Sequence, residues 1–158
     1  MTLPNSSSTT ARLPHWQLSC DAEGIGWLCF DRQDAGANTL SAETMAELHS
    51  LLDDLAGRAL RGLVIYSGKD SGFIAGADIN EFPTLTSEER AFALTRQGQQ
   101  VFDRLEQLPY STVAVLNGYA LGGGLEMTLA CHYRVVADNP KIKLGLPESK
   151  VGLLPGAG

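Results

Sequence analysis

The chain has 158 residues, of which 44% are hydrophobic and 19% are charged, and its formal net charge is −6. A chain of this length can bury one core, and this composition is too apolar for a disordered chain and too interrupted by polar residues for a membrane span. The acidic balance, without a lysine- and arginine-rich stripe, argues against a nucleic-acid partner, because such a surface needs cations to replace phosphate counterions.

The cysteines and the first residues indicate the cell compartment. Cys20, Cys29 and Cys131 are odd in number and show no CxxC spacing, so neither a disulfide framework nor a thiolate zinc site is expected. A reducing cytoplasm fits this pattern. Residues 1–14 lack the apolar segment of a secretory signal, and their Ser, Thr and Pro content predicts a flexible tail outside the fold.

The first elements after this tail are strands and one helix. Residues 15–21 and 25–31 are strand-like runs around a short glycine-containing loop, which predicts a β-hairpin. Ser41 suits a helix N-cap, and apolar residues then recur at steps of three and four until Gly57, which predicts an amphipathic helix. The apolar, β-branched run at residues 63–66 predicts a buried strand.

The second half continues the alternation of strand and helix. Thr86 and Glu89 have the spacing of a capping box, and the apolar stripe that follows predicts the longest helix. Residues 113–116 predict another buried strand, from which glycines lead into a short apolar helix at residues 124–131, and a further strand is predicted at residues 134–137. This alternation predicts an α/β fold with parallel strands and helices packed outside the sheet.

Two glycine-rich stretches, residues 73–79 and 117–126, each follow a predicted buried strand. Ligands in α/β proteins bind at the carboxyl ends of strands, and glycine lets a substrate carbonyl approach backbone N–H groups, so a two-amide oxyanion hole is one natural use. The dinucleotide pattern GxGxxG fails because Met127 stands where its last glycine is required. Neither GxxxxGK[ST] nor GxSxG occurs, so a P-loop and a nucleophile elbow are not expected.

No metal site is predicted either. His15, His49 and His132 lack the HExxH spacing and a nearby cysteine pair, and each is interpreted as a surface or packing histidine. Two carboxylates remain as candidates. Glu126 lies in the first turn of the short apolar helix, where it could simply complement the helix dipole, and Glu148 follows Leu146-Pro147, where it could lie on a solvated loop.

The order of three motifs gives these carboxylates a joint context. The motifs are Ala75 to Ile79, Asn117 to Glu126, and Gly145 to Glu148 continuing through residues 151–158. With them, residues 15–158 resemble the crotonase family of enoyl-CoA hydratases and isomerases, specifically the hydratase portion of the bacterial multifunctional fatty-acid oxidation proteins. The resemblance implies a repeated ββα spiral that is truncated at its C-terminal end, so residues 15–158 would form a partial hydratase/isomerase domain with exposed apolar surface.

The resemblance also implies roles for individual residues. In the proteins that this chain resembles, backbone amides at the positions of Ala77 and Gly123 bind the thioester oxygen, and glutamates at the positions of Glu126 and Glu148 flank a water molecule. The neighbouring positions assigned to the substrate-binding loops are Gly76, Asp78, Gly122 and Gly124. The implied activity is the syn addition of water to 2-enoyl-CoA in fatty-acid β-oxidation, with coenzyme A as part of the substrate and no separate cofactor.

The division of labour is a hypothesis: Glu148 delivers the α-proton, and Glu126 holds and activates the water. Two alternatives stay open, a 3-enoyl-CoA to 2-enoyl-CoA isomerase and a non-catalytic, CoA-binding fragment. An acyl-CoA thioester, further copies of the chain and a thiolase subunit are the partners that the resemblance implies. The spacing of 22 positions from Glu126 to Glu148 is slightly longer than in simpler hydratases, and a turn around Pro140 would absorb the difference.

Overall fold

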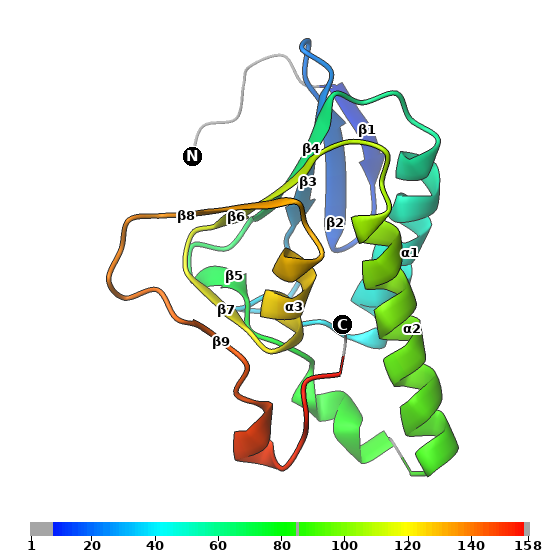
Figure 1. Cartoon of the computed structure of the whole chain (residues 1–158), viewed down its shortest axis with the longest axis vertical. Coiled ribbons are helices and arrows are strands. Elements are labelled where there is room, and N and C mark those ends of the chain that lie inside the picture. The colour runs from blue at the N-terminus through cyan, green and yellow to red at the C-terminus, as the bar shows by residue number, and fades with distance from the viewer. Residues whose placement is uncertain (1–7, 85, 157–158) are drawn as a thin grey trace.

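The fold contains two sheets, a large one of six strands and a small one of three (Figure 1). The computed structural model describes residues 8–84 and 86–156. The large sheet has the strand order β1-β2-β3-β4-β6-β8, and the small sheet has the order β5-β7-β9. Along the chain the elements are β1 (Ser8–Arg12), β2 (Trp16–Cys20), β3 (Ile25–Phe30), α1 (Ala42–Ala56), β4 (Gly62–Ser67), β5 (Gly72–Ile74), the 3₁₀ helix η1 (Ile79–Thr84), α2 (Glu88–Glu106), β6 (Thr112–Leu116), β7 (Tyr119–Leu121), α3 (Gly123–Leu129), β8 (Tyr133–Val136), β9 (Leu144–Gly145) and the 3₁₀ helix η2 (Glu148–Val151).

The predicted hairpin is confirmed, since β2 and β3 pair antiparallel from Trp16–Phe30 to Cys20–Gly26. Strand β1 pairs antiparallel with β2, so residues 8–12, which the sequence placed in the tail, belong to the sheet. This strand is polar and lies at the edge, where backbone pairing to β2 stabilises it without an apolar pattern that could be read from the sequence. The remaining tail residues 1–7 lie outside the described part of the chain.

The central strands β3, β4, β6 and β8 are parallel, which confirms the predicted pairing. Neighbouring parallel strands need a crossover, and α1 supplies one between β3 and β4, while α2 lies between β4 and β6 in the chain. Leu28, Ile65 and Ala114 face one another across three of these strands and are fully buried. The strands predicted at residues 63–66, 113–116 and 134–137 are therefore confirmed, with ends that differ by at most one residue.

Helices α1 and α2 lie side by side (Figure 1) and form the core with the large sheet. Helix α1 begins at the predicted N-cap Ser41, whose hydroxyl accepts a hydrogen bond from the Thr44 amide at 3.2 Å, and it ends at Gly57. Trp16 stacks on Phe30 with ring centroids 4.2 Å apart and donates its indole N–H to the Thr44 carbonyl at 2.9 Å. This contact ties the first turn of α1 to the sheet.

The start of α2 corrects one prediction. Its N-cap is Ser87, whose hydroxyl accepts from the Arg90 amide at 3.2 Å, so the capping box predicted at Thr86 and Glu89 is wrong by one residue. Adjacent hydroxyl residues look equivalent in the sequence, and the extended backbone of Ser87 decides which one caps. The C-terminal half of α2 is buried in the core through Val101 and Leu105, whereas its N-terminal half is largely exposed.

The small sheet was not predicted, because strands of three, three and two residues are too short for a periodic pattern. Its strands are parallel: β5 directly precedes the first sequence motif, β7 lies inside the second, and β9 ends on the first residue of the third. Across the described ranges, no helix combines the length and apolar composition that crossing a membrane requires.

Candidate active site

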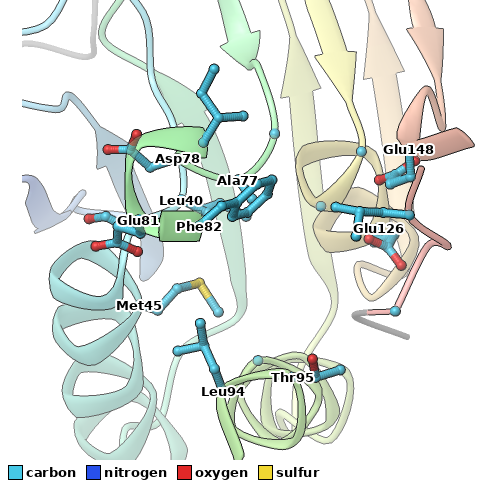
Figure 2. A pocket seen from close by; sticks show the side chains of 18 of the residues that line it. Leu40, Met45, Ala77, Asp78, Glu81, Phe82, Leu94, Thr95, Glu126 and Glu148 are labelled. Carbon is cyan, nitrogen blue, oxygen red and sulfur yellow. The ribbon is translucent and has the colours of Figure 1, made fainter. Parts of the chain in front are cut away.

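The small sheet brings the three motifs to one cavity. Its parallel strands end at Ile74, Leu121 and Gly145, and the carboxyl ends of parallel strands lie at the same edge of a sheet. The residues that follow line a cavity of about 600 Å³ (Figure 2), a size typical of small-molecule sites. Among its lining residues are Gly76, Ala77, Asp78, Gly122, Gly123, Glu126 and Glu148, which are seven of the eight predicted site residues.

The backbone around Ala77 is held so that its own amide stays available. The Leu40 amide donates to the Gly76 carbonyl and the Asp78 amide donates to the Leu40 carbonyl, both at 2.8 Å, in a parallel bridge between Leu40 and Ala77. In such a bridge the N–H of the residue opposite Leu40 points away from it. Within residues 8–84 and 86–156 the Ala77 amide donates no hydrogen bond, and the residue is exposed.

Gly122 and Gly123 form the turn from β7 into α3. The Gly122 amide donates to the Gly145 carbonyl at 2.9 Å, and the Gly122 carbonyl accepts the first helical hydrogen bonds from Leu125 and Glu126. Gly122 has φ 53° and ψ −132°, a backbone conformation open to glycine. Gly123 is the first residue of the helix, where the amide has no intrahelical partner, and it donates to no other described residue.

The two glutamates lie against these two successive glycines. One Glu148 oxygen lies 2.6 Å from the point where a Gly122 side chain would begin, and one Glu126 oxygen lies 3.9 Å from the corresponding point on Gly123. Glu126 is buried, with 6% of its surface exposed, and Figure 2 shows both carboxyl groups on the same side of the cavity. The second Glu148 oxygen is buried and has no hydrogen-bond partner among the residues with described positions. A buried carboxyl oxygen without a partner is costly, so it indicates a place for a ligand or a water molecule.

The remaining walls of the cavity are mainly apolar and come from elements distant in the sequence. Figure 2 shows Met45 of α1, Phe82 of η1 and Leu94 of α2 across the cavity from the two glutamates. The apolar stripe in the first half of α2, through Ala91, Leu94 and Gly98, therefore lines the cavity and does not pack in the core. Such a surface suits a hydrocarbon chain.

Two of the predicted loop residues have structural contacts. The Asp78 carboxyl group forms an ion pair with Arg32 at 2.7 Å, and the Arg32 guanidinium holds the pKa of that carboxyl below its usual value. Gly124 does not line the cavity. A side chain on Gly124 would begin 2.6 Å from the Ile74 carbonyl oxygen, so the missing side chain lets α3 pack directly on β5.

Sequence reasoning missed two polar residues that support the site. Asn38 is fully buried, and its amide group donates to the Phe30 carbonyl at 2.9 Å, the Ser67 hydroxyl at 3.0 Å and the Phe73 carbonyl at 3.2 Å. Arg32 lines a second cavity of about 480 Å³, which shares Ala75, Ala77, Asp78 and Ile79 with the first. Both residues lie in a loop without periodicity, and the only signal for them was the polar composition of residues 31–39.

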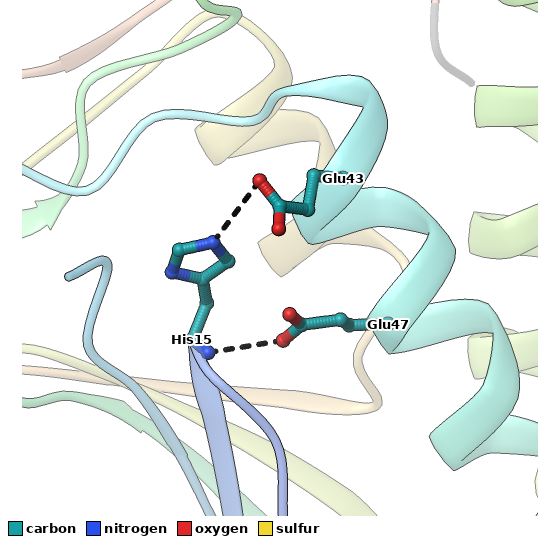
Figure 3. A group of neighbouring side chains, drawn as sticks. All are labelled: His15, Glu43 and Glu47. Carbon is teal, nitrogen blue, oxygen red and sulfur yellow. Dashed lines mark hydrogen bonds and ion pairs between the residues drawn. The ribbon is translucent and has the colours of Figure 1, made fainter.

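Figure 3 shows a polar cluster outside this cavity, formed by His15, Glu43 and Glu47. The His15 ring accepts a hydrogen bond at Nδ1 from the Gln33 amide at 3.2 Å, and its Nε2 lies 3.5 Å from the Glu43 carboxyl. Glu47 accepts from the His15 amide at 3.0 Å. These contacts fasten the start of β2 to α1 and give His15 a packing role.

None of the cysteines takes part in the cavity. All three are free thiols, and burial raises the pKa of Cys131 to about 11, which keeps it protonated and unreactive.

Comparison with known proteins gives consistent matches over most of the chain. Residues 21–158 match the family model described as enoyl-CoA hydratase/isomerase. A fatty acid oxidation complex subunit alpha of Aliivibrio fischeri is 48% identical over 140 residues, and the match covers 87% of this chain and 20% of that protein. The Vibrio campbellii protein of the same name is 44% identical over 146 residues, and the match covers 90% of this chain and 20% of that protein. The solved structure of an enoyl-CoA hydratase from Bacillus anthracis superposes with a TM-score of 0.76 at 30% identity, covering 98% of this chain and 55% of that one. The chain thus spans about a fifth of the length of the curated relatives and about half that of the solved structure.

Proposed function

Because this chain belongs to the enoyl-CoA hydratase/isomerase family, with the crotonase-type α/β fold that the sequence predicted, we propose that it adds water to a 2-enoyl-CoA thioester in fatty-acid β-oxidation. The observation that carries the proposal is the meeting of two hydrogen-bond donors and two carboxyl groups in one cavity. The donors are the amides of Ala77 and Gly123, and the carboxyl groups are those of Glu126 and Glu148. Each group corresponds to one requirement of the hydration reaction.

The two amides would stabilise the charge that develops during water addition. When the water oxygen attacks the β-carbon, the double-bond electrons move through the α-carbon to the thioester oxygen, which becomes enolate-like. N–H donors already fixed in place stabilise this oxyanion more than the neutral carbonyl of the substrate, and each such donor is worth about 3 kcal/mol. The parallel bridge at Leu40 fixes Ala77, and the first turn of α3 fixes Gly123.

The two glutamates would transfer the protons. The Glu126 carboxylate accepts a proton from the attacking water, and the protonated Glu148 donates a proton to the α-carbon as the enolate collapses. One proton leaves the water, one reaches the α-carbon and the hydroxyl stays on the β-carbon. Glu126 ends protonated and Glu148 ionised, and proton exchange with solvent water restores both groups before the next turnover. Both carboxyl groups lie against neighbouring glycines on one side of the cavity, which supports addition of both parts of water to the same face of the double bond.

The two cavities share the loop around Ala77 as a wall and suit the two ends of the substrate. The apolar cavity, with Met45, Phe82 and Leu94, would hold the acyl chain, and the second cavity, with the polar residues Thr39 and Asn80, would hold the polar coenzyme A portion. A thioester carbonyl on the Ala77 amide would then lie between them. Coenzyme A belongs to the substrate, and the proposed mechanism uses no separate cofactor.

The proposal is tested by incubating the protein with 2-enoyl-CoA and following loss of the enoyl absorbance, beside the variants Glu126→Gln and Glu148→Gln. General acid–base groups contribute about 10²- to 10⁴-fold, so each variant is expected to lose activity by a factor in this range while its circular dichroism stays unchanged. Undiminished turnover in either variant would refute the pairing. A parallel assay with 3-enoyl-CoA separates hydration from isomerisation, and acyl-CoA binding without turnover in the wild type would favour the non-catalytic alternative.

We further propose that the protein works in the cytoplasm as part of an assembly that contains further copies of itself and a thiolase subunit. Support comes from its surface: all four residues of the edge strand β8 are exposed, including Tyr133, Val135 and Val136. Exposed apolar side chains gathered on one strand are typical of interaction surfaces. Light scattering of the purified protein tests self-association, and a monomer at all concentrations contradicts it.

A further inference from the structure

The loop that presents the Ala77 amide is fixed on one side by the ion pair between Arg32 and Asp78, of which only Asp78 was predicted to belong to the site. We propose that Arg32 and Asp78 are positioning residues, which hold the Ala77 amide at the angle that the oxyanion of the proposed hydration reaction requires. This inference rests on the proposed function and adds two side chains to its machinery.

The backbone near Ala77 needs such a support because it contains a glycine on one side and a turn on the other. Gly76 has φ +110°, in a region open to glycine, so the residue itself limits the chain direction only weakly. Directly after Asp78 the chain turns into η1. The Asp78 side chain spans this turn, because its Oδ1 accepts from the Asn80 amide at 3.0 Å and from the Asn80 side chain at 2.9 Å, while its Oδ2 accepts from Arg32.

Arg32 in turn contacts both segments of the parallel bridge. Its amide donates to the Asn38 side-chain oxygen at 2.8 Å, and one guanidinium nitrogen donates to the Thr39 hydroxyl. Another guanidinium nitrogen lies 2.7 Å from the Asp78 carboxyl. The guanidinium group therefore joins Thr39 and Asp78, the residues immediately beside the bridge between Leu40 and Ala77. A planar fork with several donors can hold two partners at a fixed angle, which a lysine cannot.

Burial makes this ion pair more than a surface contact. The side chains of Arg32 and Asp78 are 23% and 9% exposed, so solvent screens the pair less than an open one. The carboxyl oxygens and two guanidinium nitrogens already have protein partners. A simpler role for Arg32 would be to attract the phosphates of coenzyme A from the second cavity, and that role would affect KM, whereas a positioning role affects kcat.

The experiment compares Asp78→Asn, Arg32→Met and Arg32→Lys with the control Arg58→Met. The control removes the ion pair between Arg58 and Asp54 at the far end of α1, about 20 Å along that helix from Ser41. Misplacing a catalytic group by about 1 Å costs about 10²-fold, so Asp78→Asn and Arg32→Met are expected to lower kcat by roughly 10- to 100-fold with KM changed less than about 3-fold. Arg32→Lys should retain folding and show an intermediate kcat, and Arg58→Met should leave kcat unchanged.

A second readout reports on the oxyanion hole directly. In the wild type, the infrared C=O stretch of bound enoyl thioester should shift to lower frequency, and this shift should shrink in Asp78→Asn and in Arg32→Met. The double variant should be no worse than the poorer single one, because both changes remove the same support. Unchanged kcat and C=O stretch in correctly folded variants overturn the inference, as does a loss confined to KM. If the wild type itself does not hydrate 2-enoyl-CoA, the proposed function fails, which is a different outcome.

Discussion

Replacing Gly122 with alanine is expected to displace the Glu148 carboxyl group and to slow the proposed hydration step. The added methyl carbon would begin 2.6 Å from the nearer Glu148 oxygen, about 0.8 Å short of the 3.4 Å at which ordinary contact starts. The Glu148 carboxyl or the loop after β7 must therefore shift by nearly 1 Å. A shift of this size at a catalytic group costs about 10²-fold in rate, so kcat should fall by about a hundredfold.

The same substitution has a cost in stability. Alanine at φ 53° and ψ −132° is strained, which lowers the free energy of unfolding by about 1–3 kcal/mol. Urea unfolding measures this term separately from turnover, and the assay should be run where both proteins are fully folded. Gly36→Ala is a matched control, since no atom lies within 4 Å of the new carbon and Gly36 lines neither cavity.

A double variant tests whether the clash with the Glu148 carboxyl causes the loss of activity. Glu148→Asp shortens the side chain and withdraws the carboxyl from the space that the new methyl group at position 122 would occupy. The further loss from Glu148→Asp should therefore be smaller in the Gly122→Ala background than in the wild type, because neighbouring changes that relieve one clash are not additive. Wild-type kcat in Gly122→Ala, or strictly additive losses in the double variant, would show that the Glu148 carboxyl does not act from the observed position.

Three further predictions concern the supports of the site. Asn38→Ala leaves several buried groups around Phe30 and Phe73 without partners and should lower the unfolding free energy by about 3 kcal/mol or more; a change under about 1 kcal/mol in urea unfolding contradicts this account. Gly124→Ala overpacks the contact with Ile74 and should lower the free energy of unfolding by about 1–3 kcal/mol. Gly98→Ala in α2, where the new methyl group meets open space, should raise it by about 0.5–1 kcal/mol. Equal changes in the melting temperature of the two variants would refute this explanation. The lowered pKa of Asp78 means that its ion pair stabilises the fold above the ordinary aspartate pKa of about 3.9 and that this stabilisation is lost as the pH falls through the lower, folded-state pKa. The difference in unfolding free energy between wild type and Asp78→Asn should thus be largest near neutral pH and shrink in acid, and a difference independent of pH would contradict it.

The predicted elements that the structure confirms have strong local sequence signals. The hairpin, α1, the parallel strands β4, β6 and β8, and the second half of α2 all follow from apolar periodicity together with a capping residue or glycine. The errors fall where such signals are absent or duplicated, as in the polar edge strand β1 and the neighbouring hydroxyl residues Thr86 and Ser87. Pairing partners, which the local sequence does not contain, decide these cases.

Some features of the candidate site also follow from the local sequence, and others depend on the tertiary structure. The sequence determined which residues were available: two glycine-rich turns, two glutamates in apolar surroundings and an order of motifs that resembles one family. Only the tertiary structure decided that Glu126 and Glu148 lie against successive glycines, and that Arg32 pairs with Asp78 beside Ala77. The physical reason is that strands of two or three residues are not stable by themselves and form only when parallel neighbours supply their hydrogen bonds. The small sheet that aligns the three motifs is therefore a product of the whole fold.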